Sequence, residues 1–411
     1  MAKLGIDFGT SNTTIAWVDP KTGRPNSFRI EGEEKIPSVI YFAPEGTTPI
    51  VGPAAFAIYE MANDIVDPIV KRETLAGVIS GIKRDMDYDS KVYLANGSIV
   101  TYVELLAIYF DFIKKAVELS LEAHGEKITE VCITHPVDFT VEKKSILKEA
   151  AQKAGFLKVK LLQEPVAASM GYVADESYKG QGILVYDFGG GTFDLAYVKF
   201  DSNGDRYMLP PLGDSTCGGE NIDLLLYNEW DKKTVSVCGR HIAENEYEVD
   251  LSFLKKTCEH QKRFLSDWHK KTDDDYKLRA SRFGKPLEMI ISKKAWETML
   301  GPIVDRTISL TGEMINQIKS EKLPLDRVIL IGGSSRIPLV SKRLKDEFGI
   351  VPDNVPEQDI AVALGALSFI SESTPEVKIC YCRKCGTQLT SKMKFCNRCG
   401  KDNFRYNHRF D

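Results

Sequence analysis

The stretch LVYDFGGGTFDLAYVKF (residues 184–200) has a counterpart near the start of the chain, LGIDFGTSNTTIAWVDP (residues 4–20). Asp7 and Asp187 hold the same place in the two copies, 180 positions apart, and each is followed by Phe-Gly and later by a short apolar run. A repeat with a short period would indicate a solenoid. A repeat at this long spacing instead predicts two related halves of one molecule.

Each copy has the pattern of a strand, a tight turn and a second strand. The turns consist of small residues, Gly9–Asn12 in one copy and Gly189–Gly191 in the other. Small residues allow backbone N–H groups to face a phosphate, and carboxylates such as Asp7 and Asp187 suit a hydrated Mg²⁺ between them and the phosphate. Two ordinary glycine hairpins are the alternative, but the matched aspartates favour a nucleotide site.

A second pair of elements also recurs. Residues 130–134 have the pattern of a buried strand and are followed by a helix over 141–154. Residues 327–331 form a similar strand, followed by a Gly-Gly-Ser-Ser turn and a helix over about 337–348. Each half thus has a hairpin first and a strand-turn-helix later. This order predicts two α/β lobes related by a pseudo-twofold axis, with a nucleotide in the cleft between them.

The composition agrees with a large globular protein. The chain has 411 residues, of which 43% are hydrophobic, and a formal net charge of −4, so nothing global indicates nucleic acid or membrane as a partner. No apolar run reaches the roughly 18–20 residues of a membrane span, and the N-terminus lacks the pattern of a secretory signal. We therefore expect a cytoplasmic protein without a membrane partner. Four scattered cysteines are expected to be buried apolar residues: Cys132, Cys217, Cys238 and Cys258.

A charged segment near residue 260 is a candidate nucleoside site. Glu259, Lys262, Arg263 and Ser266 are spaced to share one helix face. A flat guanidinium can stack on a purine and a serine can hydrogen-bond a ring nitrogen, while Glu259 and Lys262 can reach ribose hydroxyls. The alternative is a solvated charged face, which the two glycine hairpins make less favourable.

Several stretches together resemble the actin-like ATPase superfamily and, within it, the heat-shock-70 chaperone family of DnaK type. They are GIDFGTSNT (5–13), LLQEPVAASMGY (161–172), YDFGGGTFD (186–194), CEHQKRFLS (258–266) and IGGSSRIP (331–338). The resemblance implies a two-lobed α/β fold of the actin-like, ribonuclease-H-like kind over residues 1–370. Lobe I would span about 1–175 with a C-terminal helix at about 357–370, and lobe II about 176–356.

The resemblance also implies ATP or ADP with Mg²⁺ and a role for each site residue. Asp7, Asp187 and Asp194 would hold the metal, Glu164 would lie between the metal and the attacking water, and Thr192 would face that water. Asp187, Glu164 and Thr192 would thus be catalytic, together with a lysine that steers the water. We place this lysine at Lys83 in SGIKRDM, with Lys71 in VKRET as the rival. The implied nucleotide contacts are Gly9, Thr10, Ser11, Asn12, Gly189, Gly190, Gly191, Thr192, Gly218, Gly219, Glu220, Glu259, Lys262, Arg263, Ser266, Gly332, Gly333, Ser334, Arg336 and Asp359.

The C-terminal segment departs from the family. A linker at 371–379 is followed by Cys382-x₂-Cys385 and Cys396-x₂-Cys399, a spacing that predicts a zinc ribbon over 380–411. The ribbon would dock on a protein. Its excess of basic residues makes nucleic-acid contact the less favoured alternative. The apolar linker and peptide-binding domain of the chaperones are expected to be absent.

We expect a protein that slowly hydrolyses ATP and acts as a nucleotide-driven switch, which an unidentified protein partner reads through the nucleotide state or the ribbon. Three alternatives fit parts of the pattern. An actin-like filament subunit or a small-molecule kinase would share the phosphate loops. A scaffold that does not hydrolyse ATP would not need Asp7, Asp187, Thr192 and Glu164 together.

Overall fold

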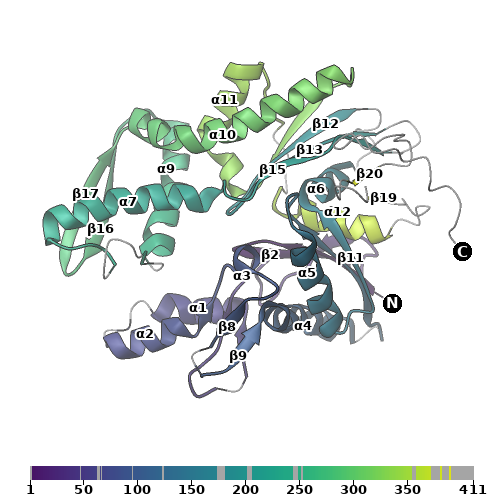
Figure 1. Ribbon diagram of the computed structural model, residues 1–411, viewed down its shortest axis with the longest axis horizontal. Coiled ribbons are helices and arrows are strands. Elements are labelled where there is room, and N and C mark those ends of the chain that lie inside the picture. Colours follow the sequence, from purple (N-terminus) through teal and green to yellow (C-terminus); the bar gives the residue numbers. More distant parts are fainter. Residues whose placement is uncertain are drawn as a thin grey trace, which may run out of the picture. The chain divides into compact units, whose positions relative to one another are not determined.

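The computed structural model describes residues 2–46, 48–62, 65, 67–94, 96–122, 125–173, 181–200, 206–243, 249–250, 253–353, 358–371, 380–381 and 388–389. The chain divides into two compact units, Met1–Ile370 and Ser371–Asp411. In the second unit, the described residues form an antiparallel pair of strands, β19 (Cys380–Tyr381) and β20 (Gln388–Leu389). The first unit is described below and in Figure 1.

The first sheet of this unit has six strands. Its order is β11 (Lys158–Gln163), β10 (Ile128–His135), β1 (Ala2–Phe8), β2 (Asn12–Val18) and β3 (Pro25–Ser27), with β4 (Ile36–Pro37) paired to β2. β1 is parallel to β10 and antiparallel to β2. Because parallel neighbours end at the same sheet edge, the carboxyl ends of β1 and β10 bring Asp7 and Thr134 together.

The second sheet repeats this arrangement with five strands. Its order is β14 (Arg206–Met208), β13 (Phe193–Phe200), β12 (Gly182–Phe188) and β18 (Arg327–Ile331), with β15 (Leu212–Asp214) paired to β13. Again the central strand β12 is antiparallel to one neighbour and parallel to the other. Asp7 lies opposite Thr14, and Asp187 lies opposite Asp194, so the hairpin register is the same after a shift of 180 residues. The two hairpins predicted from the repeat are therefore present.

Each sheet has its own helices and core. α4 (Tyr102–Leu121) and α5 (Val141–Lys153) pack with the first sheet, and α10 (Lys293–Ser320) and α11 (Pro338–Phe348) pack with the second. α4 begins with a capping box, in which the Thr101 side chain accepts from the Glu104 N–H and Glu104 accepts from the Thr101 N–H. The two clusters of buried apolar side chains are separate, which agrees with the prediction of two α/β halves.

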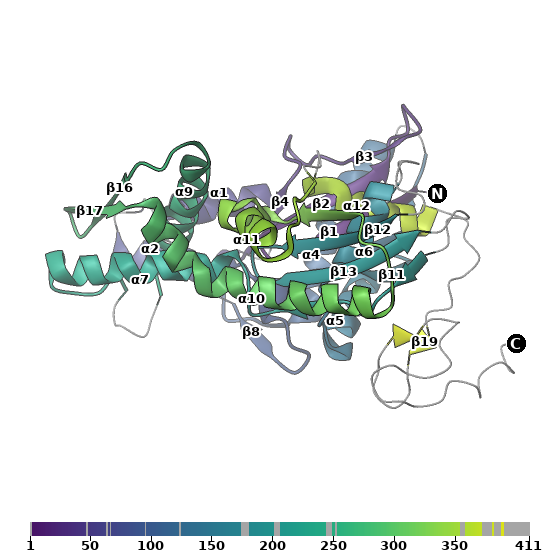
Figure 2. The same ribbon diagram turned by 90° about the horizontal axis from the view of Figure 1, so that it is seen from above.

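Two helices join the halves in a third core cluster. α6 (Glu164–Val173) and α12 (Gln358–Ser371) lie side by side in Figures 1 and 2. A Cβ at Gly365 would lie 1.7 Å from the Ala167 carbonyl oxygen, and one at Gly5 would lie 2.2 Å from the Ala363 oxygen. Glycine is therefore required where α12 crosses α6 and β1. The helix α12, which follows the second sheet in the chain, thus packs against the first sheet.

The remaining elements extend from the two sheets. In the first half they are β5 (Ile40–Tyr41), β6 (Ile50–Val51), α1 (Pro53–Ala62), α2 (Pro68–Ala76), β7 (Val78–Ile79), α3 (Ile82–Asp85), β8 (Lys91–Tyr93) and β9 (Ile99–Thr101). In the second half they are α7 (Gly219–Cys238), the π-helix η3 (Leu254–Glu259), α9 (His260–Lys271), β16 (Tyr276–Arg282), β17 (Lys285–Ile291) and the 3₁₀-helix η4 (Gly333–Arg336). Within the described ranges, no helix combines the length and apolar character that a membrane crossing requires.

Candidate nucleotide site

The turns of the two repeated hairpins face each other. A Cβ at Gly191 would lie 3.1 Å from the Thr10 hydroxyl oxygen, and one at Gly190 would lie 3.7 Å from the Ser11 hydroxyl oxygen. At Gly9 a Cβ would be only 2.2 Å from the Asn12 carbonyl oxygen, so the first turn closes only with glycine. The structure thus brings together the two predicted phosphate loops.

Hydrogen bonds from the start of α7 and from η4 hold the second glycine turn. Gly219 N–H donates to Gly189 O at 3.0 Å, and Glu220 N–H donates to Gly190 O at 2.7 Å. The Ser334 hydroxyl donates to the same Gly189 oxygen at 2.8 Å. Two separate predicted segments therefore hold the backbone of this loop in place.

Two further glycines allow this close packing. A Cβ at Gly218 would lie 2.5 Å from the Gly190 carbonyl oxygen, and Gly332 has φ +79° with its Cβ direction 2.4 Å from the Phe188 carbonyl oxygen. Gly333 has open space around its Cβ direction, and Arg336 is exposed at the end of η4. Glycine at 218 and 332 is thus required where these loops pack against the second glycine turn and the end of β12.

Carboxylates line the ends of the central strands. Asp187 and Asp194 are buried and lie directly opposite each other in β12 and β13. Asp194 Oδ1 accepts from the Val137 N–H at 2.9 Å, whereas its Oδ2 is buried and has no hydrogen-bond partner in the described part of the chain. Asp7 Oδ1 accepts from the Thr134 hydroxyl at 2.8 Å. Together with Glu164, these three aspartates place four acidic groups in one small region.

This crowding changes the protonation of the cluster. Burial raises the pKa of Asp187 well above its ordinary value, and the neighbouring carboxylates of Glu164, Asp194 and Asp7 raise it further. Burial also raises the pKa of Asp194 to about 6, although the Val137 N–H lowers it. Without a bound cation, burial thus favours the protonated forms of Asp187 and Asp194.

Lys83 is the cation that faces this cluster. It lies on α3, donates a hydrogen bond to Glu164 Oε1, and both side chains are buried. Burial alone would lower the pKa of Lys83, but Glu164 and Asp7 outweigh it and hold the pKa above its usual value. Burial raises the pKa of Glu164 to about 8, which Lys83 only partly offsets. Lys83 is therefore protonated, and its charge favours the carboxylate form of Glu164, which burial disfavours.

The rival lysine occupies a different place. Lys71 lies in the middle of α2 and is half-exposed. Glu164 is the first residue of α6, immediately after β11, so a helix start and a strand end coincide there. Thr192 is half-buried between the second glycine turn and β13. Lys83 thus lies with Glu164 and the aspartates, whereas Lys71 lies on a different helix, α2.

Among the predicted nucleoside-binding residues, Arg263 is exposed, whereas Lys262 and Ser266 are held by hydrogen bonds to neighbouring groups. The Arg263 guanidinium donates to Glu259 and is 68% exposed, so it presents a flat cationic surface. Lys262 Nζ instead donates to Gly219 O at 3.0 Å and to Asp223 Oδ2 at 2.9 Å. The Ser266 hydroxyl donates to the Lys262 carbonyl oxygen at 2.8 Å. Glu259 ends the π-helix η3 and the other three residues belong to α9, and the Glu259–Arg263 pair agrees with the predicted helix face.

Some predictions concern parts that the structure does not describe. Asp359 lies on α12, but its side chain is outside the described residues. The four cysteines at 382, 385, 396 and 399 are also outside them. Among the side chains that are described, no group of three or more His, Cys, Asp or Glu is arranged to hold a metal ion directly. The described residues therefore do not test the zinc prediction.

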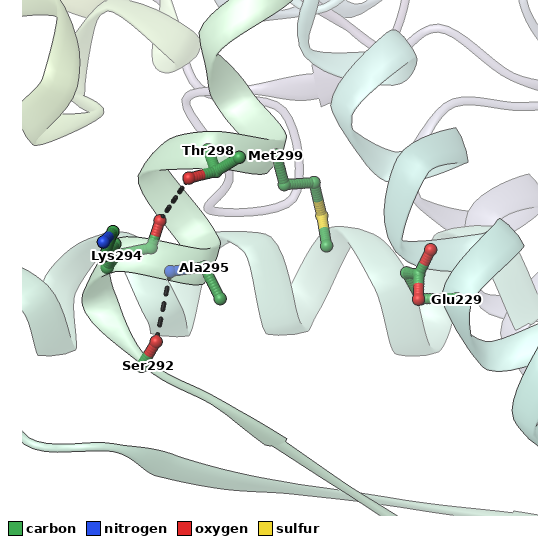
Figure 3. Close-up of a pocket in the computed structure, with 6 residues that line it drawn as sticks. All are labelled: Glu229, Ser292, Lys294, Ala295, Thr298 and Met299. Carbon is green, nitrogen blue, oxygen red and sulfur yellow. Dashed lines mark hydrogen bonds between the residues drawn. The ribbon is translucent and has the colours of Figure 1, made fainter.

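Figure 3 shows a hollow in another part of the second half. It has a volume of about 530 Å³ and lies between α7 and the first turns of α10. Its lining residues are Glu229, Ser292, Lys294, Ala295, Thr298 and Met299. None of them belongs to the predicted nucleotide contacts, so this hollow is separate from the carboxylate cluster.

Sequence reasoning missed several contacts of the site. Thr134 and Val137 hold Asp7 and Asp194, and they lie at and just beyond the end of β10. A signal was present, because a buried strand over 130–134 was predicted in the same half as the first hairpin, and polar groups at adjacent strand ends meet. Asp223, which binds Lys262, and Arg84, which binds Glu220, carry no comparable local signal.

Comparison with known proteins identifies the family. Residues 3–371 match the family model described as Hsp70 protein. Chaperone protein DnaK of Thermotoga neapolitana is 30% identical over 371 residues, which are 88% of this chain and 58% of that protein. Chaperone protein DnaK of Thermosipho africanus is 29% identical over 370 residues, with the same two shares. The chain therefore belongs to the Hsp70 family, whose nucleotide-binding domain has a two-lobed, actin-like α/β fold. It spans a little over half the length of the curated relatives it matches.

Proposed function

We propose that this chain is a Mg²⁺-dependent ATPase of Hsp70 type, which hydrolyses ATP slowly and acts as a nucleotide-driven switch for a protein partner. The observation that carries the proposal is the buried Lys83–Glu164 pair, set among aspartates next to two facing glycine turns. Membership of the Hsp70 family supports ATP as the nucleotide. Phosphoryl transfer depends on positioning and charge neutralisation, and both are provided by residues of this kind.

The carboxylate cluster fits a hydrated Mg²⁺. The Asp194 Oδ2 is buried without a hydrogen-bond partner in the described chain, and mutual repulsion raises the pKa of Asp187. A dication relieves that repulsion, and Mg²⁺ binds through a few carboxylates and several waters. Asp7, Asp187 and Asp194 would hold the ion. When bound, it would neutralise charge on the phosphate oxygens.

The chain's own groups supply the rest of the reaction. Backbone N–H groups of the turns at 9–12 and 189–192 bind the β- and γ-phosphates. Lys83 has three donors, of which one is used by Glu164, so others can orient the attacking water. The water oxygen bonds to the γ-phosphorus while the bond to the bridging oxygen breaks, and Glu164 accepts the water proton. Thr192 contributes its hydroxyl beside that water, and ADP and phosphate are released.

The nucleoside would lie against the exposed side of α9. The Arg263 guanidinium provides a planar surface for the purine, and Glu259 orients it through their ion pair. Gly332 and Gly333 offer backbone without a side chain near the α-phosphate. Ser334 and Arg336 would contact the base. These placements follow the resemblance and the geometry of the described backbone.

Binding and turnover test the proposal together. Titration calorimetry should show ATP binding that weakens when Mg²⁺ is chelated, and a phosphate-release assay should show slow hydrolysis. Glu164→Gln should keep ATP binding but reduce hydrolysis by at least about 100-fold, because the water loses its base. No ATP binding by the wild-type protein would refute the proposal.

The same assays separate the two alternative activities. Turnover that rises on adding a small hydroxylated substrate would indicate a kinase. Sedimentation that depends on both ATP and protein concentration would indicate a filament subunit. Slow hydrolysis without either response is the result expected of a switch.

The C-terminal segment is proposed to be a zinc ribbon that reads a protein partner. Its support is the spacing of Cys382, Cys385, Cys396 and Cys399. A cytoplasmic location remains a prediction from the sequence.

A further inference from the structure

One ion pair connects the two halves of the first unit beside the proposed site. Arg84 Nη1 donates to Glu220 Oε2, although the two residues are 136 positions apart. The Arg84 side chain is 51% exposed and that of Glu220 is 15% exposed. Neither the family resemblance nor the mechanism above uses Arg84.

Arg84 is held firmly on the side of the first half. It belongs to the one-turn helix α3 and follows Lys83, which pairs with Glu164. Its guanidinium donates two hydrogen bonds to the Asp85 carboxylate, at 2.7 and 3.1 Å. Its carbonyl oxygen accepts a hydrogen bond from Lys143 Nζ at 3.0 Å. A guanidinium fixed by two bonds loses less freedom when it forms a third. Movement of Arg84 is therefore coupled to that of Lys83.

Glu220 is held equally firmly on the side of the second half. It lies in the first turn of α7, and its own N–H donates to the Gly190 carbonyl oxygen. The preceding Gly219 N–H donates to Gly189. The Glu220 carboxylate and the glycine turn therefore move together. As a result, the ion pair links α3 directly to the loop at 189–191.

The halves also meet at a second place, so the ion pair is not their sole connection. Val166 of α6 lies in one buried apolar cluster with Val185 of β12 and Ile329 of β18. Loss of Arg84 is thus expected to leave the halves in contact.

We propose that Arg84 is a positioning residue, which through Glu220 holds the Lys83–Glu164 pair against the glycine turn at 189–191 and slows nucleotide release. This inference rests on the proposed function. An ion pair with one well-buried partner and a preorganised guanidinium is a case in which such a contact contributes measurably. Its loss should let α3 separate from the loop more often, which both frees the nucleotide and misplaces Lys83.

A double-mutant cycle on the full chain tests the inference. Release of a fluorescent ADP is followed by stopped flow after a chase with unlabelled ATP, for wild type, Arg84→Ala, Glu220→Ala and the double variant. Each single change should raise the release rate about two- to fivefold, the range that an ion pair of this exposure supports. The double variant should be no faster than the faster single one, because the second change removes nothing further.

Two further variants keep the outcome clear. Arg84→Lys retains the charge but lacks the planar guanidinium that donates two hydrogen bonds. Its release rate should lie between those of wild type and Arg84→Ala. Arg306→Ala is the matched control, because Arg306 pairs with Asp214 at similar exposures of 51% and 19%, within the second half alone. Its release rate should equal that of the wild type. Single-turnover hydrolysis should fall in the two Arg84 variants and not in the control.

Three results would overturn the inference. Release from Arg84→Ala that matches the Arg306→Ala control would remove the positioning role. Additive effects in the double variant would show that the two side chains act separately. A wild-type protein that binds no nucleotide would overturn the proposed function as well, whereas binding with unchanged release in Arg84→Ala would overturn only the role of Arg84.

Discussion

The Lys83 ammonium group donates to the Glu164 carboxylate, and this contact is buried although 81 positions separate the two residues. Lys83 comes from the short helix α3, and Glu164 begins α6 at the end of a strand of the first sheet. A buried lysine that keeps its charge requires nearby anions, and here Glu164 and Asp7 provide them. The pair therefore marks the region in which the chain concentrates buried charged side chains.

The Lys83→Ala variant should lose hydrolysis while it retains nucleotide binding. The water would lose its orienting donor, so single-turnover hydrolysis should fall by at least about 100-fold. The dissociation constant for ATP should change little, because the glycine turns still bind the phosphates. Lys71→Ala is the control and should hydrolyse ATP normally. If the two variants behave in the opposite way, Lys71 is the water-positioning lysine.

Asp194→Asn should stabilise the protein in the absence of Mg²⁺ and nucleotide while it impairs hydrolysis. The pKa of Asp194 is raised to about 6, above the ordinary value near 4, so its neutral form favours folding and this contribution is lost as pH rises through 6. Asparagine avoids that loss and can still accept from the Val137 N–H. The free energy of unfolding should rise by about 1–2 kcal/mol at pH 7.5.

The same variant provides its own pH control. At about pH 3, below the ordinary pKa of an aspartate, the side chain is mostly neutral in both folded and unfolded chains, so the gain should largely disappear. Asp267→Asn changes an exposed aspartate of α9 and should have little effect at either pH. Urea titration at the two pH values measures the difference. A destabilised Asp194→Asn protein at pH 7.5 would contradict the crowding of carboxylates.

Thr101→Ala should weaken the start of α4, the long helix that packs on the first sheet. The change removes the hydroxyl that accepts from the Glu104 N–H and leaves one helix donor without its cap. The free energy of unfolding should fall by about 1 kcal/mol. Thr101→Ser keeps a capping hydroxyl and should stay close to wild type. Denaturant titration compares the three proteins, and equal stability of the alanine and serine variants would count against the cap.

Metal analysis tests the proposed zinc ribbon. The chain should contain one zinc ion, and Cys385→Ser should lower that content because it removes a thiolate ligand. Cys380→Ser is the control and should leave zinc unchanged. Because metal binding and folding of so small a segment are coupled, chelation should unfold it while ATP affinity of the first unit persists. A chain that is free of zinc when purified in zinc-containing medium would contradict the ribbon.

Local sequence was sufficient for the repeated hairpins. The apolar and β-branched runs around the glycine turns at Gly9 and Gly189 indicated two hairpins, and the hairpin register places Asp194 opposite Asp187. The family resemblance identified the same loops and is confirmed by the match over residues 3–371. Such features depend on neighbours in the chain, so they can be recognised without a structure.

Contacts between distant segments were beyond sequence reasoning. Nothing near Arg84 indicates a partner 136 positions away, and the choice between Lys83 and Lys71 depends on how α3 and α2 pack. The π-helix that ends at Glu259 likewise follows from tertiary packing and not from residue spacing. The assigned roles of the site residues remain predictions that the variants above can test.

Single-turnover hydrolysis of Mg²⁺-ATP by wild type and Asp187→Asn tests the central claim most directly. Asp187 ends β12 at the glycine turn and has the carboxylates of Asp194, Glu164 and Asp7 around it. If these groups hold the metal that serves ATP hydrolysis, the wild type should convert bound ATP to ADP and phosphate, and the variant should do so at least about 100-fold more slowly. Equal rates in the two proteins would contradict the account.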